Sequence, residues 1–94
     1  MSENHLPPEA LDDWAAALCE QFALAPEDVP ISLILDLAAD VSRGVARPAA
    51  PFSAYVAGLV AGRRGGSPDA VREAVAEISR MAAAWTARPL PDQP

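Results

Sequence analysis

The chain has 94 residues, 51% of them hydrophobic, and its 13 acidic residues against 7 basic ones give a net charge of −6. This length supports one domain with a single modest core. The negative charge argues against general binding to nucleic acids or to anionic membranes.

The cysteine content and the lengths of the apolar runs favour the cytoplasm. Cys19 is the one cysteine, so no internal disulfide can form, and residues 1–5 lack the cationic and apolar regions of a secretion signal. No apolar run reaches the roughly 18 residues that a transmembrane helix requires. One cysteine and one histidine also fall short of the set of about four such ligands that a zinc site uses. We therefore expect a cytoplasmic protein without a metal or a cofactor.

The first predicted element is an amphipathic helix over residues 9–23, preceded by a flexible arm over residues 1–8. Acidic residues crowd its first turns, where the helix dipole favours negative charge. Apolar side chains recur along it at helical spacing and predict one buried side. These side chains belong to Leu11, Trp14, Ala15, Leu18, Cys19 and Phe22.

A second helix is predicted over residues 31–46, after a turn that contains Pro26 and Pro30. The apolar residues expected to face the core are Ile31, Ile34, Leu37, Ala38, Val41 and Val45. Charged residues follow another side and are called the polar line below; they are Asp36, Asp40, Arg43 and Arg47. Asp40 can pair with Arg43 one helical turn away. Two interpretations stay open: a solvated face, or a surface that recognises a polar ligand or partner.

The third predicted helix, over residues 51–64, is the most apolar segment of the chain. Pro48 and Pro51 restrict the backbone ahead of it. At helical spacing, larger side chains gather on one side and smaller ones on the other. The larger ones are Phe52, Tyr55, Val56, Leu59 and Val60, and the smaller ones are Ala54, Ala57, Gly58 and Ala61. Because no side of this segment is polar, we expect other parts of the protein to cover it all round.

Two glycines in this helix, Gly58 and Gly62, bear on how it packs. Each costs about 0.8–1 kcal/mol relative to alanine in a helix interior, so we expect another backbone to approach closely there. Two interpretations stay open: a central core helix, or a helix with part of its surface in a subunit or partner interface. Because three neighbouring helices line only part of its circumference, we expect a homodimer. Either the side with Ala54, Gly58 and Ala61 or the side with Tyr55 would face the second subunit.

The fourth helix has the clearest boundary signals. Gly65 and Gly66 end the preceding helix, and Ser67 is an N-cap residue followed by proline at the first helical position. The helix is predicted over residues 68–87, with apolar side chains at helical spacing. They are Val71, Ala74, Val75, Ile78, Met81, Ala82 and Trp85. Beyond it, the prolines of residues 88–94 predict an extended tail.

No segment shows the alternation of a strand, and short loops join the helices. The sequence therefore predicts an all-α fold, a compact antiparallel four-helix bundle over residues 9–87. Trp14 and Trp85 are expected in the core or at its edge. The predicted core consists of Leu11, Trp14, Leu18, Phe22, Ile34, Leu37, Val41, Phe52, Val56, Leu59, Val71, Val75, Ile78 and Met81.

Three segments resemble a known family. They are LDLA at residues 35–38, VARPAAP at residues 45–51 and GLVAGR at residues 58–63. Together they resemble a small bacterial all-helical domain of unknown function, found alone or fused to the C-terminus of molybdenum-cofactor guanylyltransferase-like proteins. The resemblance covers roughly residues 10–87 and implies a link to molybdenum-cofactor biosynthesis or molybdoenzyme maturation. It implies no catalytic residues, and the sequence lacks the glycine-rich nucleotide loop of the guanylyltransferases.

The sequence favours a non-enzymatic interaction module, because it contains no Ser/His/Asp set, Cys/His set or metal cluster. The resemblance implies a molybdenum-cofactor guanylyltransferase or a molybdoenzyme as partner. The residues predicted to bind a partner are Asp36, Asp40, Arg43, Arg47, Tyr55, Gly58 and Gly62. The alternative is an accessory that binds a small anionic ligand or a nucleotide through Arg43 and Arg47. Pro48 and Pro51 count against that alternative, because each lacks a backbone N–H group.

Overall fold

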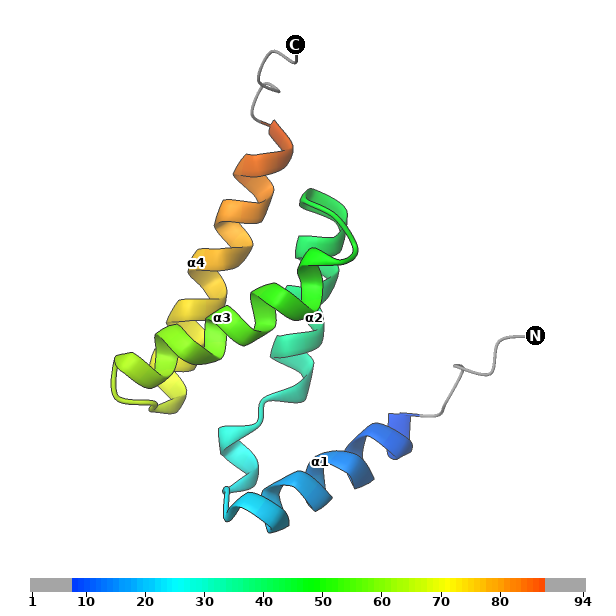
Figure 1. Cartoon of the computed structure of the whole chain (residues 1–94), viewed down its shortest axis with the longest axis vertical. Helices are drawn as coiled ribbons and strands as arrows, with labels where there is room; N and C mark the ends of the chain where they lie inside the picture. The colour runs from blue at the N-terminus through cyan, green and yellow to red at the C-terminus, as the bar shows by residue number, and fades with distance from the viewer. Residues whose placement is uncertain (1–7, 88–94) are drawn as a thin grey trace, which may run out of the picture. The chain divides into compact units, whose positions relative to one another are not determined.

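The structure is a computed structural model that describes residues 8–87 (Figure 1). Its elements are α1 (Pro8–Phe22), the 3₁₀ turn η1 (Pro26–Asp28), α2 (Ile31–Gly44), α3 (Ala49–Arg63) and α4 (Pro68–Ala87). The predicted all-α fold with four helices is confirmed for this part of the chain, which contains no strand. Every predicted helix boundary lies within two residues of the observed one. The predictions for the N-terminal arm up to residue 7 and for the tail at residues 88–94 lie outside the described residues.

The chain divides into two compact units, one ending at Ile31 and the other beginning at Ser32. The first unit holds α1 and η1. The second unit holds α3, α4 and all of α2 after its first residue. Each unit has its own internal packing. The position of each residue is therefore given relative to the other residues of its unit.

In the first unit, the chain turns back on α1 directly after the helix ends. Ala23 has a φ of 56°, in the left-handed region. The Leu24 N–H donates to the Cys19 carbonyl at 2.9 Å, which satisfies an acceptor in the last turn of α1. The Ala25 N–H then donates to the Asp28 carboxylate at 3.1 Å. Asp28 therefore stabilises η1.

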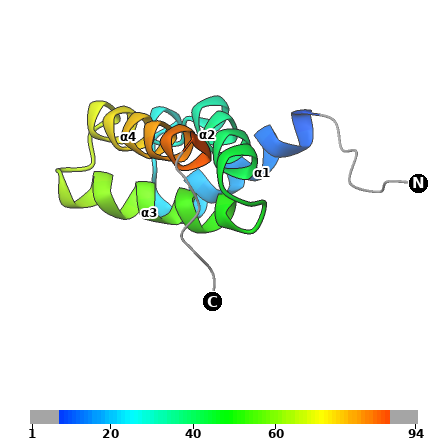
Figure 2. The same ribbon diagram turned by 90° about the horizontal axis from the view of Figure 1, so that it is seen from above.

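The core of the second unit lies where α2, α3 and α4 meet. Figure 2 shows α2 and α4 in one layer and α3 in a second layer against them. Leu37 and Val41 of α2 are almost completely buried in a cluster with Ala57 of α3 and with Val75 and Ala82 of α4. A second cluster joins α3 to α4 and consists of Ala61, Ala70 and Ala74. Alanines at these contacts let the helices approach each other closely.

The turn between α3 and α4 has the capping geometry that the sequence predicts. Gly65 and Gly66 have φ values of 103° and 75°, which glycine adopts without strain. The Gly66 N–H donates to the Ala61 carbonyl at 2.8 Å and closes the last turn of α3. The Ser67 hydroxyl accepts a hydrogen bond from the Ala70 N–H at 3.0 Å, which caps α4. Both predicted boundary signals are confirmed.

An exposed ion pair links the end of α3 to α4. The Arg64 guanidinium lies 2.9 Å and 3.3 Å from the two oxygens of the Glu77 carboxylate. These hydrogen bonds, together with the opposite charges, raise the pKa of Arg64 and lower the pKa of Glu77. Because both side chains are exposed, the pair orients the end of α3 but adds little to the stability of the fold.

The orientation of α3 about its own axis differs from the predicted one. Its small side chains face inward, with Ala57 and Ala61 buried, whereas the larger Leu59 is 42% exposed. The prediction that Leu59 belongs to the core is therefore wrong, and the described residues do not cover α3 on all sides. The physical reason is helix spacing. The close contact of α3 with α4 is made through alanines, and larger side chains there would force the helix axes apart.

Other residues predicted for the core are also exposed. They are Leu11, Trp14 and Phe22 of α1, Phe52 of α3, and Met81 and Trp85 of α4. In the first unit, the segment around η1 packs on the Cys19 side of α1, and Trp14 is 60% exposed. The predictions confirmed as fully buried are Leu37, Val41 and Val75, and those partly buried are Leu18, Ile34, Val56, Val71 and Ile78.

Candidate functional site

Besides Leu35 on α2, six large apolar side chains of the second unit are exposed, and these six are called the apolar surface below. They are Val45, Phe52, Tyr55, Leu59, Met81 and Trp85. Three come from α3, two come from α4, and one follows the last residue of α2. Exposed apolar side chains gathered in this way are typical of interaction sites.

The outer side of α3 is the centre of the apolar surface. Phe52, Tyr55 and Leu59 are three and four residues apart, so they share one face of the helix. Their exposed fractions are 68%, 69% and 42%. The face lies away from Ala57 and Ala61, which pack into the unit. Because α3 carries no charged residue before its last position, this face is apolar along its length.

A groove of about 230 Å³ extends the apolar surface from α3 to α4. Phe52 lines the groove from α3, and Met81 and Trp85 line it from α4. Val45 also lines it, and Ser53 is the one polar residue of its lining. A recess with this lining suits an apolar side chain of a partner better than a polar ligand.

Arginine side chains flank α3 at both ends. Residues 41–68 contain four arginines and no acidic residue, in a chain whose net charge is −6. Two of these arginines pair with carboxylates of α2 and α4. Arg47, in the turn before α3, and Arg63, at its last position, are exposed and pair with no carboxylate among the described residues. The apolar surface therefore has positive charge available at either end of its central helix.

The polar line has the geometry of a solvated face. Asp36 and Arg43 are exposed on α2, and the Arg43 guanidinium lies 2.7 Å from the half-buried Asp40 carboxylate. The predicted pairing of Asp40 with Arg43 is thus confirmed. Arg47 lies apart from them, in the turn before α3. A hollow of about 450 Å³ beside Arg43 is lined by residues of α2 and α4, and the neighbouring carboxylate offsets the positive charge there.

Gly58 and Gly62 are exposed on α3. A Cβ atom added at either position meets no heavy atom within 4 Å. The expectation that another backbone approaches them is therefore wrong for the described part of the chain. With Tyr55 they lie on the outer side of α3, whereas Asp36, Asp40 and Arg43 lie on α2 and Arg47 lies in the turn before α3. The predicted partner-binding residues thus fall into two groups, of which one belongs to the apolar surface.

Most of the apolar surface consists of residues that the sequence assigns to the core. For α3, a signal of its orientation is present in the sequence. Ala50, Ala57 and Ala61 recur on one side, and small residues at helical spacing mark the side where two helices approach closely. For α4, nothing in the apolar spacing distinguishes the exposed Met81 and Trp85 from its buried residues.

The backbone at the start of α3 is already occupied by hydrogen bonds. The Ala49 and Ala50 N–H groups donate to carbonyls of the preceding turn at 3.0 Å and 3.1 Å. Pro48 and Pro51 have no N–H group. An anion bound at this helix N-terminus would have to displace one of those hydrogen bonds. The start of α3 therefore gives no support to the anionic-ligand alternative.

One protein family matches most of this chain. The family described as Domain of unknown function (DUF6457) matches residues 6–90. The chain belongs to the DUF6457 family. The resemblance to an all-helical domain of unknown function is confirmed to that extent. Comparisons with curated proteins and with solved structures found no match.

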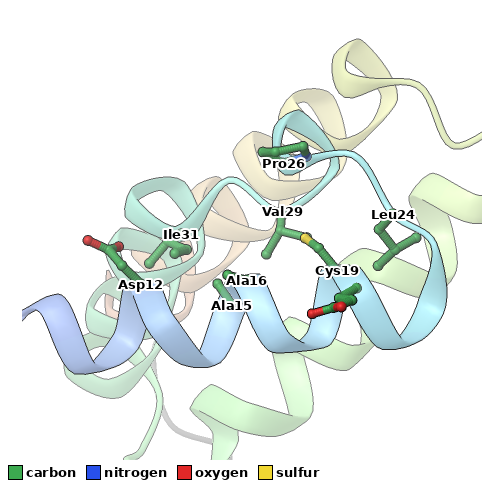
Figure 3. A pocket seen from close by; sticks show the side chains of 9 residues that line it. Asp12, Ala15, Ala16, Cys19, Leu24, Pro26, Val29 and Ile31 are labelled. Carbon is green, nitrogen blue, oxygen red and sulfur yellow. The ribbon is translucent and has the colours of Figure 1, made fainter.

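The first unit of this DUF6457 domain has a hollow of its own, of about 380 Å³ (Figure 3). Ala15 and Ala16 line it from α1, and Val29 lines it from the segment after η1. The half-buried Cys19 also lines it, and its thiol donates a weak hydrogen bond to the Ala25 carbonyl at 3.9 Å. This contact gives Cys19 a packing role in the unit, as the sequence predicts.

Residues 8–87 contain no group of three or more His, Cys, Asp and Glu side chains that could hold a metal ion. In the same range, no helix combines the length and the apolar character needed to cross a bilayer.

Proposed function

We propose that this chain is a non-enzymatic interaction module that binds a partner protein through the apolar surface. The observation that carries the proposal is the exposure of Phe52, Tyr55 and Leu59 on α3. Covering apolar area contributes roughly 25 cal/mol per Å², so a partner that packs on this face gains affinity without a deep pocket. The groove between Phe52 and α4 adds a recess for a partner side chain.

The resemblance to helical domains of molybdenum-cofactor guanylyltransferase-like proteins supports a specific class of partner. Its most specific segments are residues 45–51 and 58–63. They contribute Val45 and Leu59 to the apolar surface, and they also contain Arg47 and Arg63, which pair with no carboxylate among the described residues. The proposed partner is therefore a molybdenum-cofactor guanylyltransferase or a molybdoenzyme that receives the cofactor.

The polar line is proposed to adjust specificity. Asp36, Arg43 and Arg47 are exposed, and charges at the rim of an interface alter the association rate and the choice of partner more than the affinity. Exposed ion pairs contribute at most about 1 kcal/mol to folding. Substitutions in the polar line should therefore change partner capture while leaving the fold intact.

The test compares two exposed leucines in different places. Leu59 belongs to the apolar surface, whereas Leu35 is 52% exposed on α2, outside that surface. A guanylyltransferase and a molybdoenzyme from the native host are immobilised, and binding of the full chain is measured by biolayer interferometry. We expect Leu59→Asp to weaken binding about tenfold or more, because it places a carboxylate in an apolar contact. Leu35→Asp should leave binding unchanged.

Two results would refute this proposal. One is that the wild-type chain binds neither protein. The other is that Leu59→Asp binds as tightly as the wild-type chain. Circular dichroism of both variants serves as the control, because it shows whether each variant is folded.

The anionic-ligand alternative makes a different prediction. It requires Arg43 and Arg47 to hold a nucleotide, although Arg43 is already paired with Asp40. If it holds, guanine nucleotides should raise the melting temperature of the wild-type chain but not that of the Arg47→Glu variant. Such a shift, together with no binding to either partner protein, would favour the alternative.

A further inference from the structure

We infer that the apolar surface binds one amphipathic helix whose apolar stripe is edged by carboxylate side chains. This inference rests on the proposed function and adds the chemistry of the partner segment. It follows from three properties of the second unit: the shape of the outer side of α3, the charge at the ends of α3, and the size of the apolar surface.

The shape of the outer side of α3 suits a helix. Phe52, Tyr55 and Leu59 form a ridge along two turns, and the groove beside Phe52 runs between this ridge and α4. Gly58 and Gly62, one turn apart, leave the backbone of α3 bare, with open space where side chains would begin. A partner helix can therefore approach α3 closely at the glycines while its own side chains enter the groove.

The length of α3 sets the length of the matching partner segment. With 15 residues, α3 extends over roughly 22 Å. A partner helix of about four turns covers that length. Anchors at helical spacing, as in other helix-in-groove complexes, would then meet the ridge and the groove together.

Charge selects an acidic partner. The charged residues of segment 41–68 are all arginines, and Arg47 and Arg63 are exposed at opposite ends of α3 without a carboxylate partner among the described residues. Carboxylates along the edges of a docked helix would pair with these two guanidinium groups. Lysines in the same positions would meet like charge, which opposes association.

The same charges disfavour a second copy of this chain as the occupant. In a two-fold contact the same surface of each copy faces the other. Packing α3 against α3 in this way would bring together two segments that contain arginines and no acidic residue. Each copy would add positive charge to the contact and supply no carboxylate from residues 41–68 to offset it.

The exposed apolar area is sufficient for one docked helix. An aromatic side chain presents about 150–250 Å², so the partly exposed side chains of the apolar surface together offer on the order of 500 Å². A standard protein–protein interface buries about 800 Å² on each partner. Somewhat more than half of such an interface is apolar, so the apolar surface supplies the apolar area that a docked helix would cover.

The test uses three synthetic peptides of about 18 residues, a length of roughly 27 Å as a helix. They share one stripe of leucine and phenylalanine at helical spacing and differ only along its edges, which carry glutamate, glutamine or lysine. Binding of each labelled peptide to the full chain is measured by fluorescence anisotropy. We expect the glutamate peptide to bind at least about tenfold more tightly than the lysine peptide, with the glutamine peptide between them.

Charge reversal supplies the matched control. Arg63→Glu should remove the preference for the glutamate peptide, because it places a carboxylate beside the docked edge. Arg72→Glu changes an exposed arginine of α4 that pairs with Asp69 and lies outside residues 41–68. It should leave the order of the three affinities as in the wild-type chain.

Three outcomes overturn the inference. The first is equal affinity for the glutamate and lysine peptides, and the second is no binding of any peptide. The third is a dimer in sedimentation that Leu59→Asp dissociates, because a second copy would then occupy the surface. None of these outcomes removes the proposed function, which depends on binding of the guanylyltransferase or molybdoenzyme by the full chain.

Discussion

At the scale of single residues, Gly58 and Gly62 show how the same residue type supports opposite interpretations. A glycine inside a helix costs stability, and close packing of another backbone is a common reason to keep it. In the structure both glycines face open space. Their cost is therefore not offset by contacts among the described residues. It is instead consistent with a face left bare for a partner.

This leads to a prediction about stability. Gly58→Ala should raise the free energy of unfolding by up to about 1 kcal/mol, because alanine has the higher helix propensity and its Cβ meets nothing within 4 Å. Gly65→Ala is the matched control and should destabilise the fold by about 1 kcal/mol, because its φ of 103° disfavours a side chain. Urea denaturation measures both. A loss of stability in Gly58→Ala would show that another segment already fills this space.

At the scale of elements, helix bounds and caps follow from local sequence, but the direction in which a helix faces does not always do so. The Ser67 cap and the glycine turn before it depend on neighbouring residues alone, and both are confirmed. The apolar side of α2 is bounded by charged residues, so Leu37 and Val41 were placed correctly. In α3 apolar residues occur on every side, so the apolar pattern does not show which side faces the core. The size of the side chains at the contact with α4 decides the orientation of this helix.

The same distinction between what local sequence determines and what helix packing determines applies to the candidate site. Tyr55 was predicted to bind a partner and lies on the apolar surface, but its neighbour Leu59 was assigned to the core. The spacing that puts Tyr55 and Leu59 on one face is visible in the sequence. Whether that face points inward depends on how closely α3 packs on α4, and the local sign of this packing is the recurrence of small residues at Ala50, Ala57 and Ala61. The groove beside Phe52 likewise depends on the meeting of three separate elements.

A second prediction concerns the packing of α2. Leu37 is 0% exposed in the core cluster, whereas Leu35 on the same helix is 52% exposed. Leu37→Ala should lower the free energy of unfolding by about 2–5 kcal/mol, because it leaves a cavity. Leu35→Ala should lower it by no more than about 0.5 kcal/mol. Chemical denaturation compares the two variants, and similar losses would contradict the assigned orientation of α2.

At the scale of the whole molecule, the net charge conceals an uneven distribution. The chain is acidic overall, yet all seven of its arginines follow residue 42, and residues 41–68 have no acidic side chain. The overall charge argues against polyanions such as nucleic acids. It does not argue against a partner with a few carboxylates placed at the ends of α3. The local distribution and the apolar face together define the kind of partner that this chain suits.

Amide chemical-shift mapping tests the central claim, that the outer side of α3 and the groove beside α4 hold a partner helix. The full chain, labelled with ¹⁵N, is titrated with the glutamate peptide. The largest shift changes are predicted at residues 45–64 and 81–85, with little change at Asp36, Asp40 and Arg43 of α2. Changes confined to α2 or to the hollow beside Cys19, with α3 unaffected, would contradict the claim.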